Sequence, residues 1–232
     1  MTALQQLREE VYEANLEVVR RGLVTYTFGN ASGILRADGL VAIKPSGVPY
    51  EKLRPDDLVV VRIDGSPVEG ALRPSSDLPT HLVLYRNFPS IGGVVHTHSS
   101  FATSWAQAGR EIPCFGTTHA DYFHGPVPVT PLMGSPEIEG DYEKNTGDVI
   151  VRRFAGLNPD RFPAVLVNGH APFCWGPSPS EAARTAVILE EIARMAYYTV
   201  TLNAGAEPIS QTLHDRHFLR KHGPESYYGQ PK

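Results

Sequence analysis

Residues 91–100 read IGGVVHTHSS, and this stretch decides how the rest of the chain is interpreted. Val94 and Val95 follow two glycines, and a β-branched run of this kind is typical of a buried strand. Because side chains alternate between the two faces of a strand, His96 and His98 are expected on the same face. Two adjacent imidazoles at a strand end are half of a metal site, although one core histidine beside one surface histidine would give the same pattern.

The composition narrows the class of protein. A chain of 232 residues suits one domain or at most two small ones, and 41% hydrophobic residues can form a sizeable core. The net charge of −4 and the absence of a basic run argue against a nucleic-acid partner. Cys114 and Cys174 stand far apart and predict reduced thiols in a cytoplasmic protein. No apolar run approaches the roughly 18 residues that span a bilayer, so neither a membrane nor a secretory segment is expected.

Hydrophobic spacing and turn residues predict the remaining elements. Helices are expected over 4–19, 78–88, 99–109, 137–153 and 180–202, and further strands over 40–43, 58–63 and 164–167. Gly140 and Gly147 weaken the fourth helix, and residues 116–122 are expected to form a polar loop. Strands that follow each other without helices between them favour antiparallel pairing, and the absence of GxGxxG argues against a bound dinucleotide.

Candidate metal ligands stand at three places in the chain. Asp77 precedes a predicted helix, His96 and His98 end one apolar strand, and His170 follows another. Zinc favours imidazole nitrogen and accepts carboxylate oxygen, so these four side chains could form one site. The helix after His98 is expected to point its free N–H groups toward that site. Four other histidines lack a partner at this spacing and are expected in solvent or behind the ligands: His81, His119, His124 and His222.

Small and hydrogen-bonding residues gather on three further short loops. They are Asn30, Lys44, Ser46, Gly47, Ser75 and Ser76. Backbone N–H groups at glycine and serine, together with one lysine, can bind a phosphate monoester. Each loop taken alone is more often an ordinary turn.

Several stretches together resemble the class II aldolase and adducin-like family. They are residues 23–32 (LVTYTFGNAS), 44–48 (KPSGV), 74–81 (PSSDLPTH), 89–99 (PSIGGVVHTHS) and 116–122 (GTTHADY), with the tail segments QTLHDRHFLRKHG and YYGQ. The likeness covers nearly the whole chain. It implies an α/β fold with a central antiparallel sheet flanked by helices, as a single domain over residues 1–232. It also implies a ring-shaped homotetramer with active sites between subunits.

The resemblance assigns roles residue by residue. His96, His98 and His170 match the zinc ligands of the family, with Asp77 as a further and weaker one, and Mn²⁺ or Co²⁺ remains an alternative to Zn²⁺. The phosphate loops match Asn30, Lys44, Ser46, Gly47, Ser75 and Ser76. Asp121 and Tyr228 match acid/base residues that a neighbouring subunit donates, with Tyr227 as the adjacent alternative. Thr117 and His217 match residues near that site.

The tail and GTTHADY match the branch of the family that inverts C4 of a ketopentose phosphate, interconverting L-ribulose 5-phosphate and D-xylulose 5-phosphate. The C4 proton is β to the carbonyl and therefore not acidic, and no nicotinamide site is predicted. Retro-aldol cleavage of C3–C4 remains, with a metal stabilising the enediolate and two groups transferring protons on the two faces of the aldehyde.

Three other functions compete with this reading. An aldolase of the family would release its fragments, but resembling aldolases carry glutamate where this chain has Asp77. A non-catalytic scaffold of the adducin type would lack the ligand set. A purely structural zinc would have four protein ligands, which is the number that Asp77 and the three histidines supply. The pathway served, arabinose or ascorbate use, is left open.

Overall fold

The computed structural model describes residues 2–222 and 226–227. Its strands are β1 (Asn30–Leu35), β2 (Leu40–Ile43), β3 (Val59–Arg62), β4 (Pro67–Glu69), β5 (Gly93–His96), β6 (Ala164–Leu166) and β7 (Pro172–Gly176). Its α-helices are α1 (Ala3–Arg20), α2 (Leu78–Asn87), α3 (Ser100–Gln107), α4 (Thr117–Ala120), α5 (Ser135–Glu139), α6 (Tyr142–Arg153), α7 (Pro179–Leu202) and α8 (Gln211–His222). Two 3-10 helices, η1 (Tyr50–Lys52) and η2 (Pro55–Asp57), join β2 to β3. Within the described residues, no helix is both long and apolar enough to cross a bilayer.

The strands form one sheet in the order β4-β3-β2-β1-β5-β7-β6, and each neighbouring pair is antiparallel. The predicted α/β class with a central antiparallel sheet is therefore confirmed. The histidine strand β5 lies between β1 and β7. His96 consequently has Asn30 as its partner on one side and Phe173 on the other.

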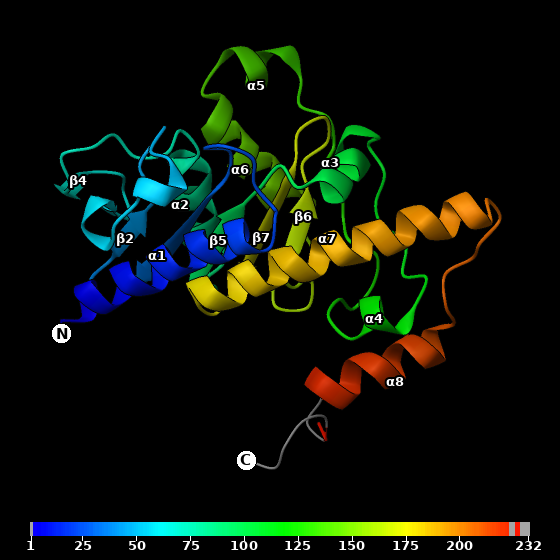
Figure 1. Ribbon diagram of the computed structural model, residues 1–232. Coiled ribbons are helices and arrows are strands. Elements are labelled where there is room, and N and C mark those ends of the chain that lie inside the picture. Colours follow the sequence, from blue (N-terminus) through cyan, green and yellow to red (C-terminus); the bar gives the residue numbers. More distant parts are fainter. Residues whose placement is uncertain (1, 223–225, 228–232) are drawn as a thin grey trace.

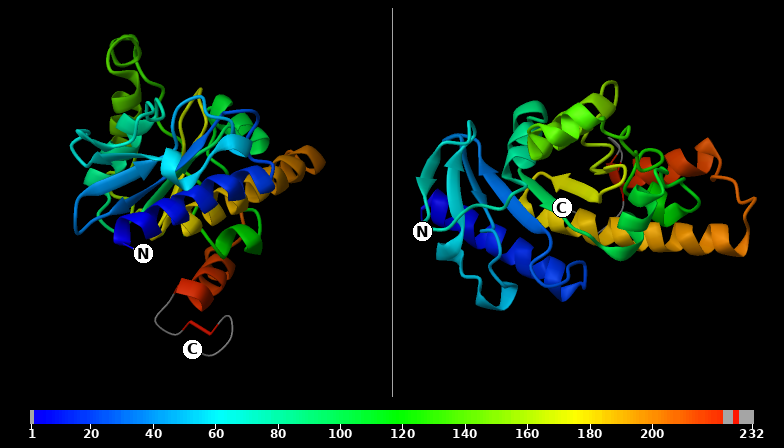
Figure 2. Two further views of the ribbon diagram at one scale, coloured as in Figure 1. Left: turned by 60° about the vertical axis from the view of Figure 1, so that its left-hand side comes forward. Right: turned by 90° about the horizontal axis from the view of Figure 1, so that it is seen from above.

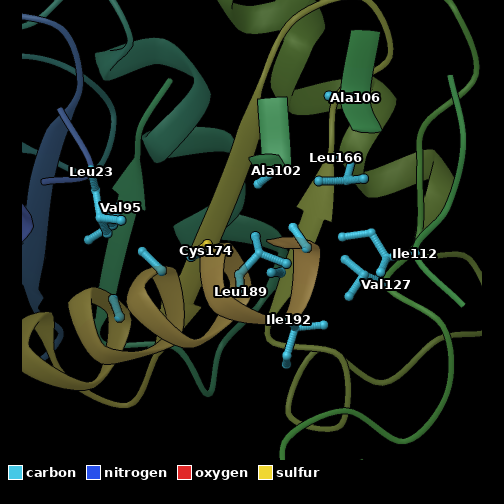
Figure 3. Packing of buried hydrophobic residues seen from close by; sticks show 14 of the residues in the cluster. Leu23, Val95, Ala102, Ala106, Ile112, Val127, Leu166, Cys174, Leu189 and Ile192 are labelled. Atoms are coloured by element: carbon cyan, nitrogen blue, oxygen red, sulfur yellow. The ribbon is translucent and has the colours of Figure 1, made fainter. Parts of the chain in front are cut away.

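Helices cover both faces of the sheet. Helices α1 and α7 run along one face, with α3 beside α7, while α2 and α6 cover the other (Figures 1 and 2). The alternation of β5 explains the two cores. Val95 belongs to the cluster that includes Cys174 of β7 and Leu189 of α7 (Figure 3), and Val94 belongs to the cluster that includes residues of α2 and α6. His96 continues the alternation on the side of Val94, so its imidazole lies on the α2 and α6 face.

Helix α7 approaches the sheet closely because β5 begins with glycine. A Cβ at Gly93 would lie 2.5 Å from the Cα of Pro179, the first residue of α7. Backbone atoms cannot move aside as a flexible side chain can, so a side chain at this position would push α7 away from the sheet. Gly93 therefore sets the distance between the start of α7 and the strand that carries His96.

Most elements predicted from hydrophobic spacing are confirmed within one or two residues at each end. The strand predicted over 40–43 is found there, and the helix predicted over 78–88 is α2. Hydrophobic spacing did not reveal β1, β4 or β7. Residues 116–122 are not entirely a loop, since α4 forms one turn within them, and the tail forms α8.

Two local expectations are wrong. The helix expected over 137–153 is divided into α5 and α6 because Gly140, with φ −88° and ψ −139°, leaves the helical region. The N-terminus of α3 does not offer free N–H groups to the metal region. The backbone N–H groups of Phe101 and Ala102 donate to the carboxylate of Glu190 on α7, at 2.9 Å each.

Candidate metal centre and substrate pocket

Three imidazoles meet where β5 ends. The Nε2 atoms of His96 and His98 are 3.1 Å apart, and the ring of His170 lies 4.9 Å from the first and 5.1 Å from the second between centroids. One donor atom from each of the three lies within 4.8 Å of the others. β5 ends at His96, so His98 stands just beyond the strand rather than in it, yet both rings lie on the same side.

The surrounding structure orients these rings. His96 Nδ1 lies 2.9 Å from the carbonyl oxygen of Pro172, the first residue of β7. As donor in this bond, Nδ1 carries the proton and leaves the Nε2 lone pair facing the other histidines. The same ring stacks on Phe173 at 4.2 Å between centroids. His96 is thus fixed in both tautomer and rotation.

The lowered pKa values of the histidines also favour the binding of a cation. Burial, followed by the proximity of His96 and His98, lowers the pKa of His170 to about 4. Burial likewise lowers the pKa of His98. At neutral pH both rings are therefore uncharged, as ligation requires. His170 Nδ1 is buried and makes no hydrogen bond among the described residues. The donor set and its neutral rings fit a divalent metal that prefers nitrogen ligands.

Asp77 lies beside this group of donor atoms but is not one of the three within 4.8 Å of one another. It occupies the N-cap position of α2, yet its side chain makes no capping hydrogen bond. Instead its Oδ2 accepts from Asn30 Nδ2 at 2.6 Å. Burial raises the pKa of Asp77, but the attraction of His96 and His81 and the bond from Asn30 outweigh it, so the pKa is lowered. The carboxylate is ionised and faces the histidines.

All six predicted phosphate-binding residues line the same cavity as the histidines and Asp77. The cavity measures about 470 Å³, and its lining includes Asn30, Lys44, Ser46, Gly47, Ser75, Ser76, Asp77, His96, His98 and His170. Lys44 is buried on the face of Tyr50, with Nζ 4.6 Å from the ring centroid, and burial lowers its pKa to about 8. Loops from distant parts of the chain therefore bring one cation and several hydroxyl groups to one place.

Sequence reasoning missed six lining residues, which are Thr27, Phe28, Gly29, Pro45, Tyr142 and Glu143. Phe28 lies beside the histidines, with its ring 6.2 Å from that of His98, and Tyr142 and Glu143 enter from the first turn of α6. The break at Gly140 was the available signal, because it starts a new helix at Tyr142 and turns that end toward the cavity.

Asp121 lies away from the cavity of its own chain. Among the described residues it does not line the cavity, and it lies at the end of α4 against α8 (Figure 1). Its carboxylate accepts from Arg220 at 2.8 and 2.9 Å and lies 3.1 Å from His217 Nδ1. Burial raises the pKa of Asp121, but the hydrogen bonds from Arg220 and His217 outweigh it and the pKa is lowered. Thr117 begins α4, and its carbonyl oxygen accepts from the Asp121 N–H at 3.0 Å.

The tyrosine assigned to acid/base chemistry, Tyr228, lies outside the described residues. Its neighbour Tyr227 is 62% exposed and donates its backbone N–H to the carbonyl oxygen of Arg220 at 3.1 Å.

The remaining histidines are mostly not in solvent. His81 is fully buried, with Nδ1 2.7 Å from Ser32 Oγ, and burial lowers its pKa to about 3. His119 is buried as well, with Nε2 2.8 Å from the Gly125 carbonyl oxygen. His81 fits the expectation of a place behind the ligands, because its ring lies edge-on to Phe173, which stacks on His96. For His119 the expectation is wrong, because tertiary packing and not local spacing decides the burial of an isolated histidine.

A family model described as "Class II Aldolase and Adducin N-terminal domain" matches residues 9–197. The chain belongs to this family. It is 52% identical over 227 residues to "L-ribulose-5-phosphate 4-epimerase UlaF" of Salmonella paratyphi A, covering 98% of this chain and 100% of that protein. The protein of the same name from Salmonella typhi matches equally well.

Solved structures of the class II aldolase family share the fold. An L-fuculose 1-phosphate aldolase superimposes with a TM-score of 0.76 at 23% identity, over 94% of this chain and 95% of its own. YgbL from Klebsiella pneumoniae, titled a putative aldolase/epimerase/decarboxylase, gives 0.74 at 29% identity, over 93% and 99%. The expected class II aldolase fold is confirmed.

Proposed function

We propose that this chain is a metal-dependent L-ribulose-5-phosphate 4-epimerase, with residues 1–232 as one catalytic domain. It would interconvert L-ribulose 5-phosphate and D-xylulose 5-phosphate. One observation carries the proposal: a single cavity holds both a three-histidine donor set and a lysine-and-serine phosphate cradle. The 52% identity to proteins of that name selects the substrate among sugar phosphates.

His96, His98 and His170 would hold the metal, with Asp77 as a further ligand or as a charge beside it. Zinc suits this donor set best, and Mn²⁺ or Co²⁺ are the alternatives. When bound, the cation would act as a Lewis acid toward the oxygens near the substrate carbonyl. Asn30 holds Asp77 by the 2.6 Å hydrogen bond, so the carboxylate keeps a fixed direction toward the histidines.

The phosphate cradle would give the reaction its specificity for epimerisation. Cleavage of C3–C4 leaves glycolaldehyde phosphate, which must turn over its other face and rejoin without escaping. Lys44, the hydroxyl groups of Ser46, Ser75 and Ser76, and the Gly47 loop would retain its phosphate during that rotation. A fragment held at one end can rotate at the other, so tight phosphate binding is compatible with inversion at C4.

The proton-transfer groups would come from a neighbouring subunit in a homotetramer. Asp121 is an ionised carboxylate outside its own chain's cavity, at the end of α4, and His217 and Arg220 of α8 contact it. Asp121 and Tyr228 of one subunit would then serve the cavity of the next, one on each face of the aldehyde. Thr117 and His217 would position Asp121. We further expect the enzyme in the cytoplasm, where its two thiols stay reduced.

The decisive experiment is incubation of the protein with L-ribulose 5-phosphate and coupled detection of D-xylulose 5-phosphate. Epimerase activity should be abolished by a chelator and restored by Zn²⁺. Stoichiometric accumulation of free glycolaldehyde phosphate without the xylulose product would instead identify an aldolase and overturn the proposal.

A further inference from the structure

A second group of side chains that could hold a metal ion lies where α8 meets the segment that follows α4. His124 Nε2 is 3.5 Å from Asp215 Oδ1, and His214 Nδ1 is 3.6 Å from the same oxygen. One donor atom from each of the three residues lies within 4.8 Å of the others. None of these residues lines the cavity described above. The group therefore needs an explanation of its own.

The spacing fits shared coordination better than hydrogen bonding. Contacts of 3.5 and 3.6 Å are too long for strong charge-assisted hydrogen bonds, which are about 2.7–2.9 Å. Donor atoms at about 2.0–2.1 Å from a tetrahedral Zn²⁺ stand about 3.4 Å from each other. The two distances to Asp215 Oδ1 are thus within a few tenths of an ångström of that value, and all three donor atoms lie within 4.8 Å of one another, so a small adjustment of the two imidazoles would let them share one ion.

The tautomer of His214 is suited to ligation. Its Nε2 lies 2.9 Å from the carbonyl oxygen of Phe123 and donates to it, so Nδ1 carries the lone pair and faces Asp215. Metal-binding histidines characteristically donate their other ring nitrogen to a carbonyl or carboxylate in this way. The side chain of His214 is 5% exposed, and Phe218 packs 4.6 Å from the ring of His124, so two of the three donors are held in place.

The amide nitrogen of Gln211 lies close to the position expected for the ion. Its Nε2 lies 2.7 Å from Asp215 Oδ1 and 3.5 Å from His214 Nδ1, so one electropositive group contacts two of the three donor atoms. A cation would replace that donor, and rotation of the amide would present its oxygen as a fourth ligand. The positive charge of Arg161 acts on His124 and opposes binding, while the Asp215 carboxylate offsets it.

We propose that His124, His214 and Asp215 form a second, structural site for a zinc-class divalent cation. The site joins α8 to the segment that follows α4. Since α8 also carries His217 and Arg220, which contact Asp121, the bound ion would hold that helix in place. This inference is independent of the proposed reaction, because it concerns ion binding outside the cavity.

The test is zinc stoichiometry of the full-length protein, stripped with chelator and dialysed against low micromolar Zn²⁺. The wild type should bind two ions per chain, and His98→Asn and Asp215→Asn should each bind one. The double variant should bind none. Asp148→Asn is the matched control, because Asp148 is 38% exposed against 42% for Asp215 and should leave both ions in place.

Hydrogen exchange measured along α8 distinguishes ion binding at this site from ion binding elsewhere in the protein. In the His98→Asn background, Zn²⁺ should slow amide hydrogen exchange over residues 211–222, and His124→Asn should abolish that effect while circular dichroism stays unchanged. One ion per chain in the wild type, or two ions retained by Asp215→Asn, would show that the cluster is an ordinary surface ion pair and overturn the proposal.

Discussion

At the residue scale, His98 separates metal binding from folding. It is an exposed side chain just beyond the end of β5, whereas the strand is held by Val94 and Val95 in two cores. His98→Asn should therefore lower metal affinity at the cavity by more than about 100-fold, since even a neighbour of a ligand contributes 10- to 100-fold. Competition with a fluorescent chelator measures this, with circular dichroism as the control for folding. Full turnover by a variant shown to lack the cavity metal would contradict the assignment.

Asp77 tests the role of charge beside the metal site. Asp77→Asn keeps the size of the side chain but removes the negative charge that faces His96. We expect epimerisation to slow by about 10- to 100-fold, with a rise in free glycolaldehyde phosphate, because the oxygens of the reacting fragments would be held too tightly. Rate and product partition are measured in one coupled assay. Values identical to those of the wild type would reduce Asp77 to a residue at the start of α2.

The lowered pKa of Lys44 predicts that substrate binding depends on pH. Burial lowers its pKa to about 8, so the side chain is charged below that pH and becomes neutral above it. If the charged form binds phosphate, KM should rise by up to about tenfold between about pH 7 and pH 9. Lys44→Arg should keep its charge and show a flatter profile over that range. Equal slopes in the two proteins would remove Lys44 from the phosphate cradle.

At the element scale, α2 and α6 pack through a glycine. A Cβ at Gly147 would lie 2.6 Å from Val83 Cβ, so the two helix axes can approach only without a side chain there. Gly147→Ala should destabilise the fold by about 1–3 kcal/mol despite the better helix propensity of alanine. The control is Gly205→Ala, where the nearest atom is 3.6 Å away and no strain is expected. Denaturant unfolding compares the two, and equal stabilities would show that α6 shifts to accommodate the methyl group.

At the scale of the whole molecule, the proposed tetramer predicts complementation between dead subunits. His98→Asn lacks the metal site, and Asp121→Asn lacks the proton-transfer carboxylate, so each homotetramer should be nearly inactive. In a random equal mixture around a cyclic ring, a metal-competent chain faces an acid-competent one with probability ~1/4. Dissociation and reassembly should restore up to about a quarter of wild-type activity.

Mixing without subunit exchange is the control for this experiment and should restore nothing. If reassembled hybrids, verified by mass, stay inactive, then Asp121 acts within its own chain or not at all. The same hybrids keep all three proposed ligands of the second site, because neither substitution replaces His124, His214 or Asp215.

Local pattern was enough to predict most of the helices, several strands and the candidate ligands that the structure brings to one cavity. The spacing of apolar residues determined β2 and α2, because the period of side-chain exposure is a property of the backbone itself. The alternation in residues 91–100 predicted that His96 and His98 lie on one side. Their rings do lie on the same side, even though the strand ends at His96. Glycine, serine and lysine on short loops suggested a phosphate site, although each loop alone is more often an ordinary turn. The structure brings all six of these residues to one cavity.

Tertiary structure decided what those residues meet. β1 and β7 flank the histidine strand but show too weak an apolar alternation to be predicted, since Asn30, Gly33 and Pro172 interrupt it. The pairing of Glu190 with the start of α3, the burial of His81, and the entry of Tyr142 into the cavity all join segments far apart in the chain. Such contacts depend on how helices pack across the sheet, and the free energy of that packing is shared among many side chains. No single stretch of sequence therefore carries it.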